Sequence, residues 1–329
     1  ADTAVIAQSI FDDSPHRGSF VTNPIKVDDS TNTDSYDAAG NIFSAGTSFD
    51  YPPLTATREA NTIIIEANIA GADFTLTTED GLSGNGIKAV YKRINSLSDL
   101  PLRAPNNFVI EIVGDADIDQ DNYWVKFTTN NDTDYGEGAW TETVCPNVSD
   151  GLDRSTMPMS IRSVDLNELE LVTLDFTKRK AGDEETNPDP SFVGQGINDV
   201  VFFKNRLGFI SDDSVVFSEA GEFFNFYRTT VSSLLDSAPI DITVSSTKVT
   251  KLKSAIIFQE NLMLFADNVQ YVMKGGDLFT PQTVSVSAST HFSLDEKVSP
   301  VLIGSYVYFP FTRGEFSGVR ELSLSANTE

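Results

Sequence analysis

The sequence predicts a mainly β chain, in which a partial β-propeller follows a small mixed α/β region. Two observations carry this prediction. Beyond residue 190, short apolar runs and turn residues repeat in three clusters of similar pattern, and before residue 160, strand-like runs surround one segment with helical spacing. With 329 residues, 40% of them apolar, the chain can bury the cores of two domains.

In residues 1–160, the signals for strands are strong after a polar, loop-like start. The run Asn61–Ile69 contains three consecutive isoleucines, and Phe108–Val113 and Tyr123–Thr128 are rich in β-branched and aromatic residues. The acidic segment 114–122 separates the last two runs, which predicts a hairpin. A short strand is expected at Trp140–Val144.

One helix is expected, over residues 85–97. Asn85 is a suitable N-cap and Pro101 a suitable stop. Apolar residues recur between them at helical spacing, namely Ile87, Val90, Tyr91, Ile94 and Leu97.

Residues 161–190 are expected to form a connecting strand and a linker, because Lys178–Pro190 is first charged and then rich in proline. Residues 191–329 are expected to form propeller blades, in an incomplete set. The strands expected there are Val200–Phe203, Arg206–Ser211, Ser214–Ser218, Ile256–Phe258, Asn261–Ala266, Val269–Met273, Val301–Ile303, Tyr306–Phe311 and Val319–Leu324.

Spacing favours the propeller. Asn205, Asn261 and Ser305 hold equivalent places in the three clusters, 56 and 44 residues apart. Propeller blades repeat every 40–50 residues or so, and each buries its faces against its neighbours. A two-sheet sandwich, which also has short strands and regular turns, stays open as the alternative.

The charge balance limits the classes of ligand. The chain has 48 acidic and 23 basic residues and a net charge of −25, so it lacks the clustered cations that bind phosphates. Such a surface can surround a nucleic acid without binding it. Simple solubility and adaptation to a saline habitat are equally acceptable explanations.

The content of cysteine and histidine argues against several chemistries. Cys145 is the only cysteine, and His16 and His291 are far apart, which disfavours a disulfide, a zinc site and a Ser-His-Asp triad. There is no apolar run of membrane-spanning length and no signal peptide, so a soluble intracellular or virion protein is expected. Because Ala1 is not methionine, we also expect a portion of a longer chain.

Candidate sites for catalysis or ligands are weak. Asp115, Asp117, Asp119 and Asp121 alternate as calcium ligands can, but Gln120 and Lys126 stand where an EF-hand needs Gly and Glu. The acids Asp183, Glu184 and Glu185 are expected to be exposed, unlike a glycosidase pair. Gly84–Gly86 and Gly275–Gly276 lack the context of a phosphate loop, and Ser289–His291 has no nucleophile elbow. No catalytic, cofactor-binding or metal-ligating residue is assigned.

One segment, Gly182–Tyr227, resembles the tail tubular protein B family, the nozzle proteins of short-tailed bacteriophages (podoviruses). The resemblance rests on a TNP-x-PSF motif, an NRLGF strand and a V-x-x-S-x-x-G-x-FFNF strand. The matching residues are Thr186, Asn187, Pro188, Pro190, Ser191, Phe192, Asn205–Phe209, Ser218, Gly221 and Phe223–Phe226.

Further blocks follow the family's order upstream. They are TEDG (78–81), SLSDLP (96–101), AP (104–105), IEIVGD (110–115) and YWVKF (123–127), followed by TMP (156–158) and IR (161–162). The resemblance covers residues from about 74 to 325. Chains of this family are much longer.

The resemblance implies a structural virion protein and not an enzyme. Residues 1–160 would be platform-like and residues 191–329 part of a propeller. Copies of the chain would form a six-fold ring in the virion tail, in contact with the tail adaptor protein and the tail fibres. The genomic DNA would pass through the channel without tight binding. Synthesis in the cytoplasm of the infected bacterium, no membrane span and no cofactor are expected.

Two other classes of function stay open. Propellers also carry glycosidases, so a virion-associated polysaccharide hydrolase is one alternative. A non-catalytic propeller that serves as a binding module is the other.

Overall fold

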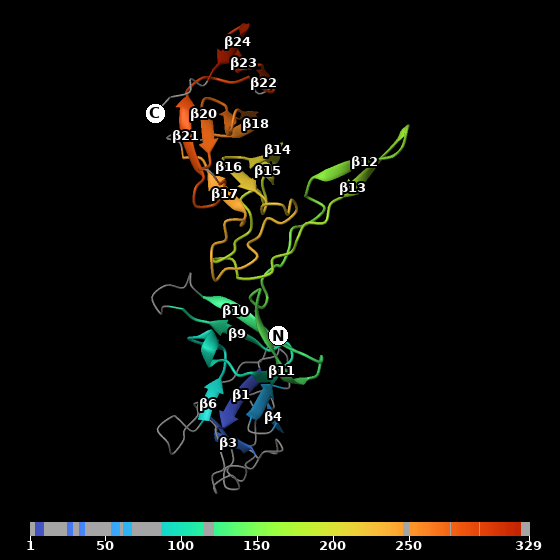
Figure 1. Cartoon of the computed structure of the whole chain (residues 1–329), viewed down its shortest axis with the longest axis vertical. Coiled ribbons are helices and arrows are strands. Elements are labelled where there is room, and N and C mark those ends of the chain that lie inside the picture. Colours follow the sequence, from blue (N-terminus) through green and yellow to red (C-terminus); the bar gives the residue numbers. More distant parts are fainter. Residues whose placement is uncertain are drawn as a thin grey trace. The chain divides into compact units, whose positions relative to one another are not determined.

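A computed structural model describes residues 87–114, 122–245, 250–276, 278–295 and 297–323, together with strands at residues 4–9, 25–28, 33–36, 54–59 and 62–67. The chain divides into two compact units, Ala1–Val148 and Ser149–Glu329 (Figure 1). In the part of the chain so described, no helix is long and apolar enough to span a membrane.

The first unit consists of β-sheets. A four-stranded sheet has the order β4-β5-β1-β6, a five-stranded sheet has the order β7-β9-β10-β11-β8, and β2 pairs with β3. The elements are β1 (Ala4–Ser9), β2 (Ile25–Asp28), β3 (Thr33–Tyr36), β4 (Leu54–Glu59), β5 (Thr62–Ala67), β6 (Ile87–Val90), β7 (Arg93–Ile94), η1 (Leu97–Asp99), β8 (Arg103–Pro105), β9 (Val109–Ile112), β10 (Tyr123–Thr129) and β11 (Tyr135–Thr143).

The hairpin and the strands expected in this unit are confirmed. Strands β9 and β10 pair antiparallel, β5 lies within the run 61–69, and β11 extends the strand expected at 140–144. Every second residue of β9 and β10 enters one apolar cluster, in which Ile110, Val125 and Phe127 are buried. The segment 115–121 between the two strands lies outside the described residues.

The helix expected over residues 85–97 is wrong. Residues 87–90 form β6, which pairs antiparallel with β1, and only Leu97–Asp99 is helical, as one 3-10 turn. Lys92 has a φ of 53°, which no right-handed helix allows. The side chain of Val90 is buried in the core of the five-stranded sheet, so tertiary pairing overrides the helical spacing. The first region is therefore not the mixed α/β layer that the spacing indicated.

The second unit contains one hairpin, β12–β13, and three successive antiparallel sheets: β14-β15-β16-β17, β18-β19-β20-β21 and β22-β23-β24. The strands are β12 (Met159–Asp165), β13 (Glu168–Thr173), β14 (Ile197–Phe203), β15 (Arg206–Ser211), β16 (Ser214–Phe217), β17 (Ile240–Thr243), β18 (Leu252–Phe258), β19 (Asn261–Ala266), β20 (Gln270–Lys274), β21 (Ser285–Thr290), β22 (Val301–Ile303), β23 (Tyr306–Arg313) and β24 (Phe316–Leu322).

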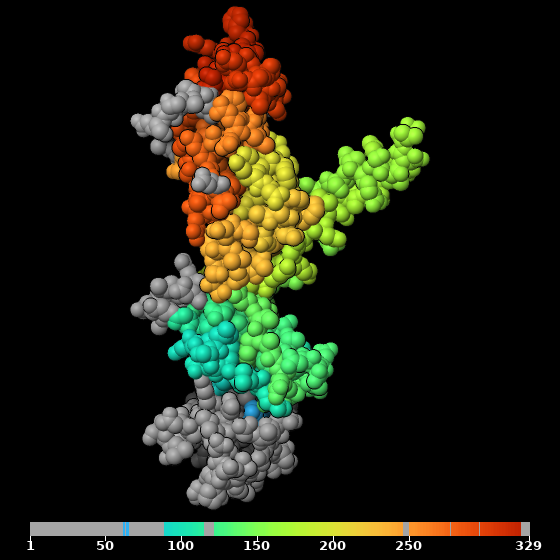
Figure 2. All heavy atoms as spheres, viewed as in Figure 1, coloured from blue at the N-terminus to red at the C-terminus, as the bar shows by residue number. Residues whose placement is uncertain are grey.

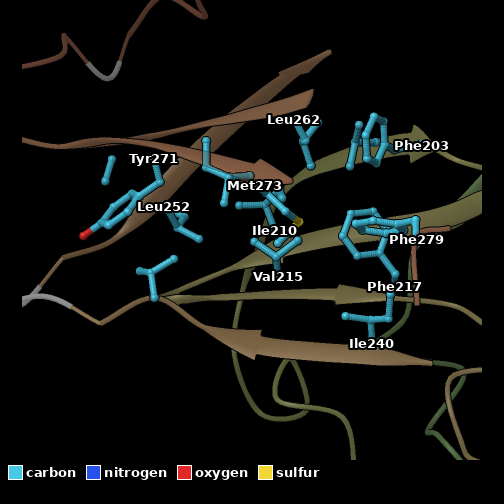
Figure 3. Packing of buried hydrophobic residues seen from close by; sticks show 14 of the residues in the cluster. Phe203, Ile210, Val215, Phe217, Ile240, Leu252, Leu262, Tyr271, Met273 and Phe279 are labelled. Atoms are coloured by element: carbon cyan, nitrogen blue, oxygen red, sulfur yellow. The ribbon is translucent and has the colours of Figure 1, made fainter. Parts of the chain in front are cut away.

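The three sheets are stacked through their side chains. Residues of β16 alternate between two cores: Val215 and Phe217 lie in a cluster shared with the second sheet, whereas Val216 lies in a cluster on the opposite face. Leu262 and Leu264 of β19 join the first of these clusters, as Figure 3 shows for Leu262. The alternate residues of β19 face Phe309 of the third sheet. The first and second sheets are thus buried on both faces.

Tight turns set the register of the first sheet. Lys204 and Asn205 have φ values of 47° and 60° between β14 and β15, and Asp212 has a φ of 45° between β15 and β16. These left-handed residues match hairpin turns that follow the twist of the strands. Gly208 allows a close approach, because a Cβ there would lie 2.6 Å from the ring of Phe217.

The nine strands expected beyond residue 190 are all present, and the bounds of β15, β19 and β22 agree to the residue. The mainly β class is confirmed. The propeller stays a prediction, because three stacked sheets do not define a closed ring. Strands β17 and β21 were not expected, and two paired strands, β12 and β13, stand where a single connecting strand was expected.

Candidate functional site: the junction of the signature segments

The structure brings together three segments that are far apart in the sequence: 186–192, 205–209 and 223–227. Their aromatic rings pack on the outer face of the first sheet. The ring centroids of Phe192 and Phe209 are 5.3 Å apart, those of Phe192 and Phe226 are 5.3 Å apart, and Phe209 stacks on Phe226 at 4.9 Å. All three rings are buried, so the segments share one apolar core.

A buried asparagine fixes the loop that carries Phe192. The side-chain amide of Asn187 donates to the carbonyl oxygens of Ala181, at 2.9 Å, and Arg228, at 3.0 Å. Its side-chain oxygen accepts from the backbone N–H of Arg228 at 2.9 Å. An asparagine side chain that bonds the backbone on both its ends acts as a clamp between segments 41 residues apart.

A second clamp is ionic. The Arg179 guanidinium is buried and lies 2.8 Å from a carboxylate oxygen of Asp189 and 4.9 Å from the centre of the Tyr227 ring. The Tyr227 hydroxyl donates to the same Asp189 oxygen at 2.7 Å. Burial, aided by Asp189, raises the pKa of the Tyr227 hydroxyl well above its ordinary value, although the Arg179 charge offsets part of the rise.

The largest polar group in the junction is Arg206, whose side chain is almost fully buried. Its two terminal nitrogens donate to backbone carbonyl oxygens at the end of β16, in the loop before β17 and in the loop between β20 and β21. These acceptors, at 2.7 to 3.3 Å, are Ser218, Asp236, Ser237, Ala238 and Phe279. One guanidinium thus ties together backbone segments that are up to 73 residues away.

The raised pKa of Tyr227 gives a prediction for alkaline pH. Above about pH 10, tyrosines of the unfolded chain release their protons, whereas folded Tyr227 keeps its own. The folded state then binds more protons, so its stability falls as the pH rises above 10. Tyr227→Phe is expected to weaken this fall, at a cost of about 1 kcal/mol at pH 8 for the lost hydrogen bond.

Urea midpoints measured from pH 8 to pH 11 check this expectation. The matched control is Tyr306→Phe, since Tyr306 is exposed. An alkaline loss of stability that is equally steep in wild type and in Tyr227→Phe would contradict the role assigned to this hydroxyl.

The acidic triplet that was considered as glycosidase carboxylates stabilises a turn. Glu184 and Glu185 are exposed, as expected, whereas Asp183 is half-buried. The Asp183 carboxylate accepts from the backbone N–H of Glu185 at 3.0 Å, and from the N–H and the hydroxyl of Thr186, each at 2.9 Å. Burial acts to raise the pKa of Asp183, but these hydrogen bonds and the Arg179 charge outweigh it and lower the pKa. A general acid of a glycosidase requires the opposite shift.

The only tight basic run, Lys178–Lys180, is not an open cationic patch. Lys178 Nζ lies 2.8 Å from a carboxylate oxygen of Asp150, and Arg179 is turned into the core. Lys178 and Lys180 are both exposed. Charges of opposite sign thus compensate two of the three cations locally.

The remaining candidates are not brought together. Asp115–Asp121 and Gly84–Gly86 lie outside the described residues, as does His16. Cys145 is half-buried at the end of β11, and His291 is exposed after β21. Among the residues described in 87–114, 122–245, 250–276, 278–295 and 297–323, no three metal-ligating side chains are grouped.

Two comparisons with known proteins agree with this arrangement. A family model described as bacteriophage nozzle protein matches residues 20–329. The tail tubular protein gp12 of Escherichia phage T7 is 37% identical over 244 residues, which are 74% of this chain and 30% of that protein. The chain therefore spans about a third of the length of this relative. The resemblance seen in residues 182–227 is confirmed, and the chain belongs to the bacteriophage nozzle protein family.

Proposed function

We propose that this chain is a structural subunit of a phage tail nozzle and forms part of the wall of the channel through which the genome leaves the virion. The observation that carries the proposal is the match of residues 20–329 to the nozzle family. The junction supports it, because its aromatic rings, its asparagine clamp and its buried arginines hold segments together and offer no reactive group.

The charge of the chain suits a conduit. With a net charge of −25, and with two of the three cations of its tightest basic run paired to carboxylates, the surface repels phosphate groups over about one Debye length, roughly 8–10 Å at cellular salt. Repulsion at that range keeps the DNA away from the wall during ejection. Weak affinity is thus the useful property of the channel.

Assembly into a ring follows from the same proposal. The T7 relative bears the name tail tubular protein, and a tube requires several copies around an axis. We expect six copies, with the adaptor protein above them and the fibres beside them. The protein would be made in the cytoplasm of the infected bacterium and would function in the tail of the virion.

The three stacked sheets are proposed to be consecutive propeller blades. Each of the first two is a four-stranded antiparallel sheet in chain order, and the third begins with the same three-stranded pattern. Their buried faces pack on one another, as blades do. A tomographic or single-particle reconstruction of the full-length protein tests both claims: a six-fold ring with propeller domains supports them, and a monomer refutes the ring.

DNA affinity is expected to be negligible. A gel-shift titration of the full-length protein with duplex DNA, at about 10 mM salt where the Debye length is about 30 Å, should show no complex up to about 100 µM protein. Micromolar binding at physiological salt would contradict the repulsive channel.

A charge-reversal variant provides the control. In Glu184→Lys/Glu185→Lys, two exposed acids that follow Lys178 and Lys180 in the sequence become cations, so that four lysines lie within residues 178–185. This variant should gain weak binding that disappears with added salt. The same preparations should leave host polysaccharide uncut, and sugar release that is lost in Asp183→Ala would favour the hydrolase alternative.

A further inference from the structure

The hairpin β12–β13 is built unlike the other sheets of its unit. It has only two strands, and its residues pack mainly on each other. Figures 1 and 2 show it as an arm that stands clear of the three stacked sheets. A two-stranded hairpin without a covering layer is marginally stable in water, so the arm requires a partner surface.

One face of the hairpin is apolar and uncharged. The register pairs Met159 with Thr173, Ile161 with Leu171 and Ser163 with Leu169, so these side chains lie on the same face. Ile161 is 70% exposed, Leu169 71% and Leu171 58%. Leu166 at the turn is 96% exposed. Contiguous exposed side chains of this kind mark an interaction surface.

The opposite face carries the charges. Arg162 and Glu170 form a cross-strand ion pair at 2.6 Å, and they project on the face of Ser160 and Val172. Charged side chains are thus confined to the polar face and to the turn, where Asp165 pairs with Glu168. The segregation of residues matches a sheet that is covered on one side and hydrated on the other.

We infer that this apolar face docks on a neighbouring copy of the same chain. The charge of the chain favours this occupant: each copy carries −25, so copies repel one another over their surfaces and must associate through contacts that bring no further charge together. The apolar face of the hairpin meets this condition, and its acids point elsewhere.

The size of the hairpin is also consistent with a contact between two copies of the chain. A stable interface uses about 20–30 residues on each side. The hairpin spans 15 residues, 159–173, so each arm supplies a large part of one side, and the receiving surface supplies the other. An arm given by every copy to the next is a head-to-tail contact, which closes into a ring when the rotation allows it. The inference rests on the proposed function, since it identifies the contact that links ring neighbours.

Photo-crosslinking in the full-length protein tests the inference. A photoreactive benzoylphenylalanine is placed at Leu169 on the apolar face or, as the matched control, at Val172 on the polar face. Residue 169 should give a ladder of dimers and higher species on a denaturing gel, and residue 172 should give at least tenfold less. A crosslink confined to the monomer band would mean that another part of the same chain covers the face, and would overturn the inference. The absence of any crosslink at 169 would overturn it as well.

A pair of variants separates the inference from the proposed function. Ile161→Ser/Leu171→Ser removes two apolar side chains from the face, whereas Arg162→Ser/Glu170→Ser alters the polar face. The first should weaken ring formation, measured by light scattering, at least tenfold while the circular dichroism spectrum stays unchanged, and the second less than threefold. A wild-type ring that survives the first change refutes the hairpin contact but leaves the nozzle function intact. A wild-type protein that never forms a ring refutes both.

Discussion

Replacing Arg206 with methionine is expected to lower the free energy of unfolding of the second unit by about 4 kcal/mol or more. Methionine fills the space of the stem, but it leaves buried carbonyl oxygens without their donor. Each unsatisfied buried group costs about 1–3 kcal/mol. Arg206 serves five carbonyls across two sheets, and of these the Ser237 carbonyl keeps a second donor, the N–H of Ala220. A unit of this size should then melt at a temperature lower by roughly 10 °C.

Chemical denaturation followed by circular dichroism measures this effect. Arg154→Met is the matched control, because Arg154 forms only an exposed ion pair with Asp175, and the change should cost no more than about 0.5 kcal/mol. Arg206→Lys should recover only part of the loss, since an ammonium cannot reach as many carbonyls as a guanidinium. A loss below about 1 kcal/mol in Arg206→Met would refute the role of this residue as a staple.

Phe209→Ala is expected to destabilise the second unit by about 3–5 kcal/mol. The ring is buried, stacks on Phe226 at 4.9 Å and meets the edge of Phe192 at 5.3 Å. Its removal opens a cavity between three segments that cannot collapse together, because the Asn187 clamp and the strand register hold them apart.

A matched truncation at a more exposed position on the same face of the sheet distinguishes burial from ring contact. Phe202 also contacts a phenylalanine, Phe223, at 5.0 Å, but it is 52% exposed. Phe202→Ala should therefore cost about 1 kcal/mol or less when both variants are unfolded in urea. Equal losses at the two positions would show that the junction does not depend on the buried core.

The strands of the second unit were predictable because local and tertiary signals agree there. The run Arg206–Ser211 is bounded by Asn205 and Asp212, both of which tolerate left-handed backbone, and its apolar residues are buried on both faces of the sheet. The apolar residues of strand β19 are likewise buried on both faces of their sheet. Where the pattern was short and polar, as in Ile240–Thr243 and Ser285–Thr290, pairing with neighbours creates the strand, and the local sequence contains little sign of it.

The prediction of a helix was wrong because local and tertiary signals disagree there. Apolar residues at 87, 90, 91, 94 and 97 fit a helical face, but three of them are β-branched, and β1 lies next to residues 87–90 as a partner strand. Sequence spacing contains no information about that partner. The hairpin β12–β13 was also missed as a pair, since only a single connecting strand was expected in 161–190.

The motifs of the junction could be recognised in the sequence, but the contacts that their residues make could not be predicted. The signature residues Asn187, Arg206 and Phe209 stood out in the sequence, yet nothing local indicated what they bind. The carbonyls bound by Arg206 lie 12 to 73 residues away, and Asp189 meets Tyr227 across 38 residues. Such partners are set by the fold, so the buried arginines are found only once the sheets are placed.

The succession of sheets in the second unit has a consequence for synthesis. Strands β14–β17 pair in chain order, and so do β18–β21 and β22–β24, so the hydrogen-bonded neighbours of each strand are adjacent in the sequence. Contacts of low sequence separation form quickly, and each sheet needs only the one before it as a surface. The ribosome synthesises this unit from its amino-terminal end, so each sheet emerges after the sheet on which it packs. Each newly emerged sheet then covers the apolar face that the preceding sheet exposes.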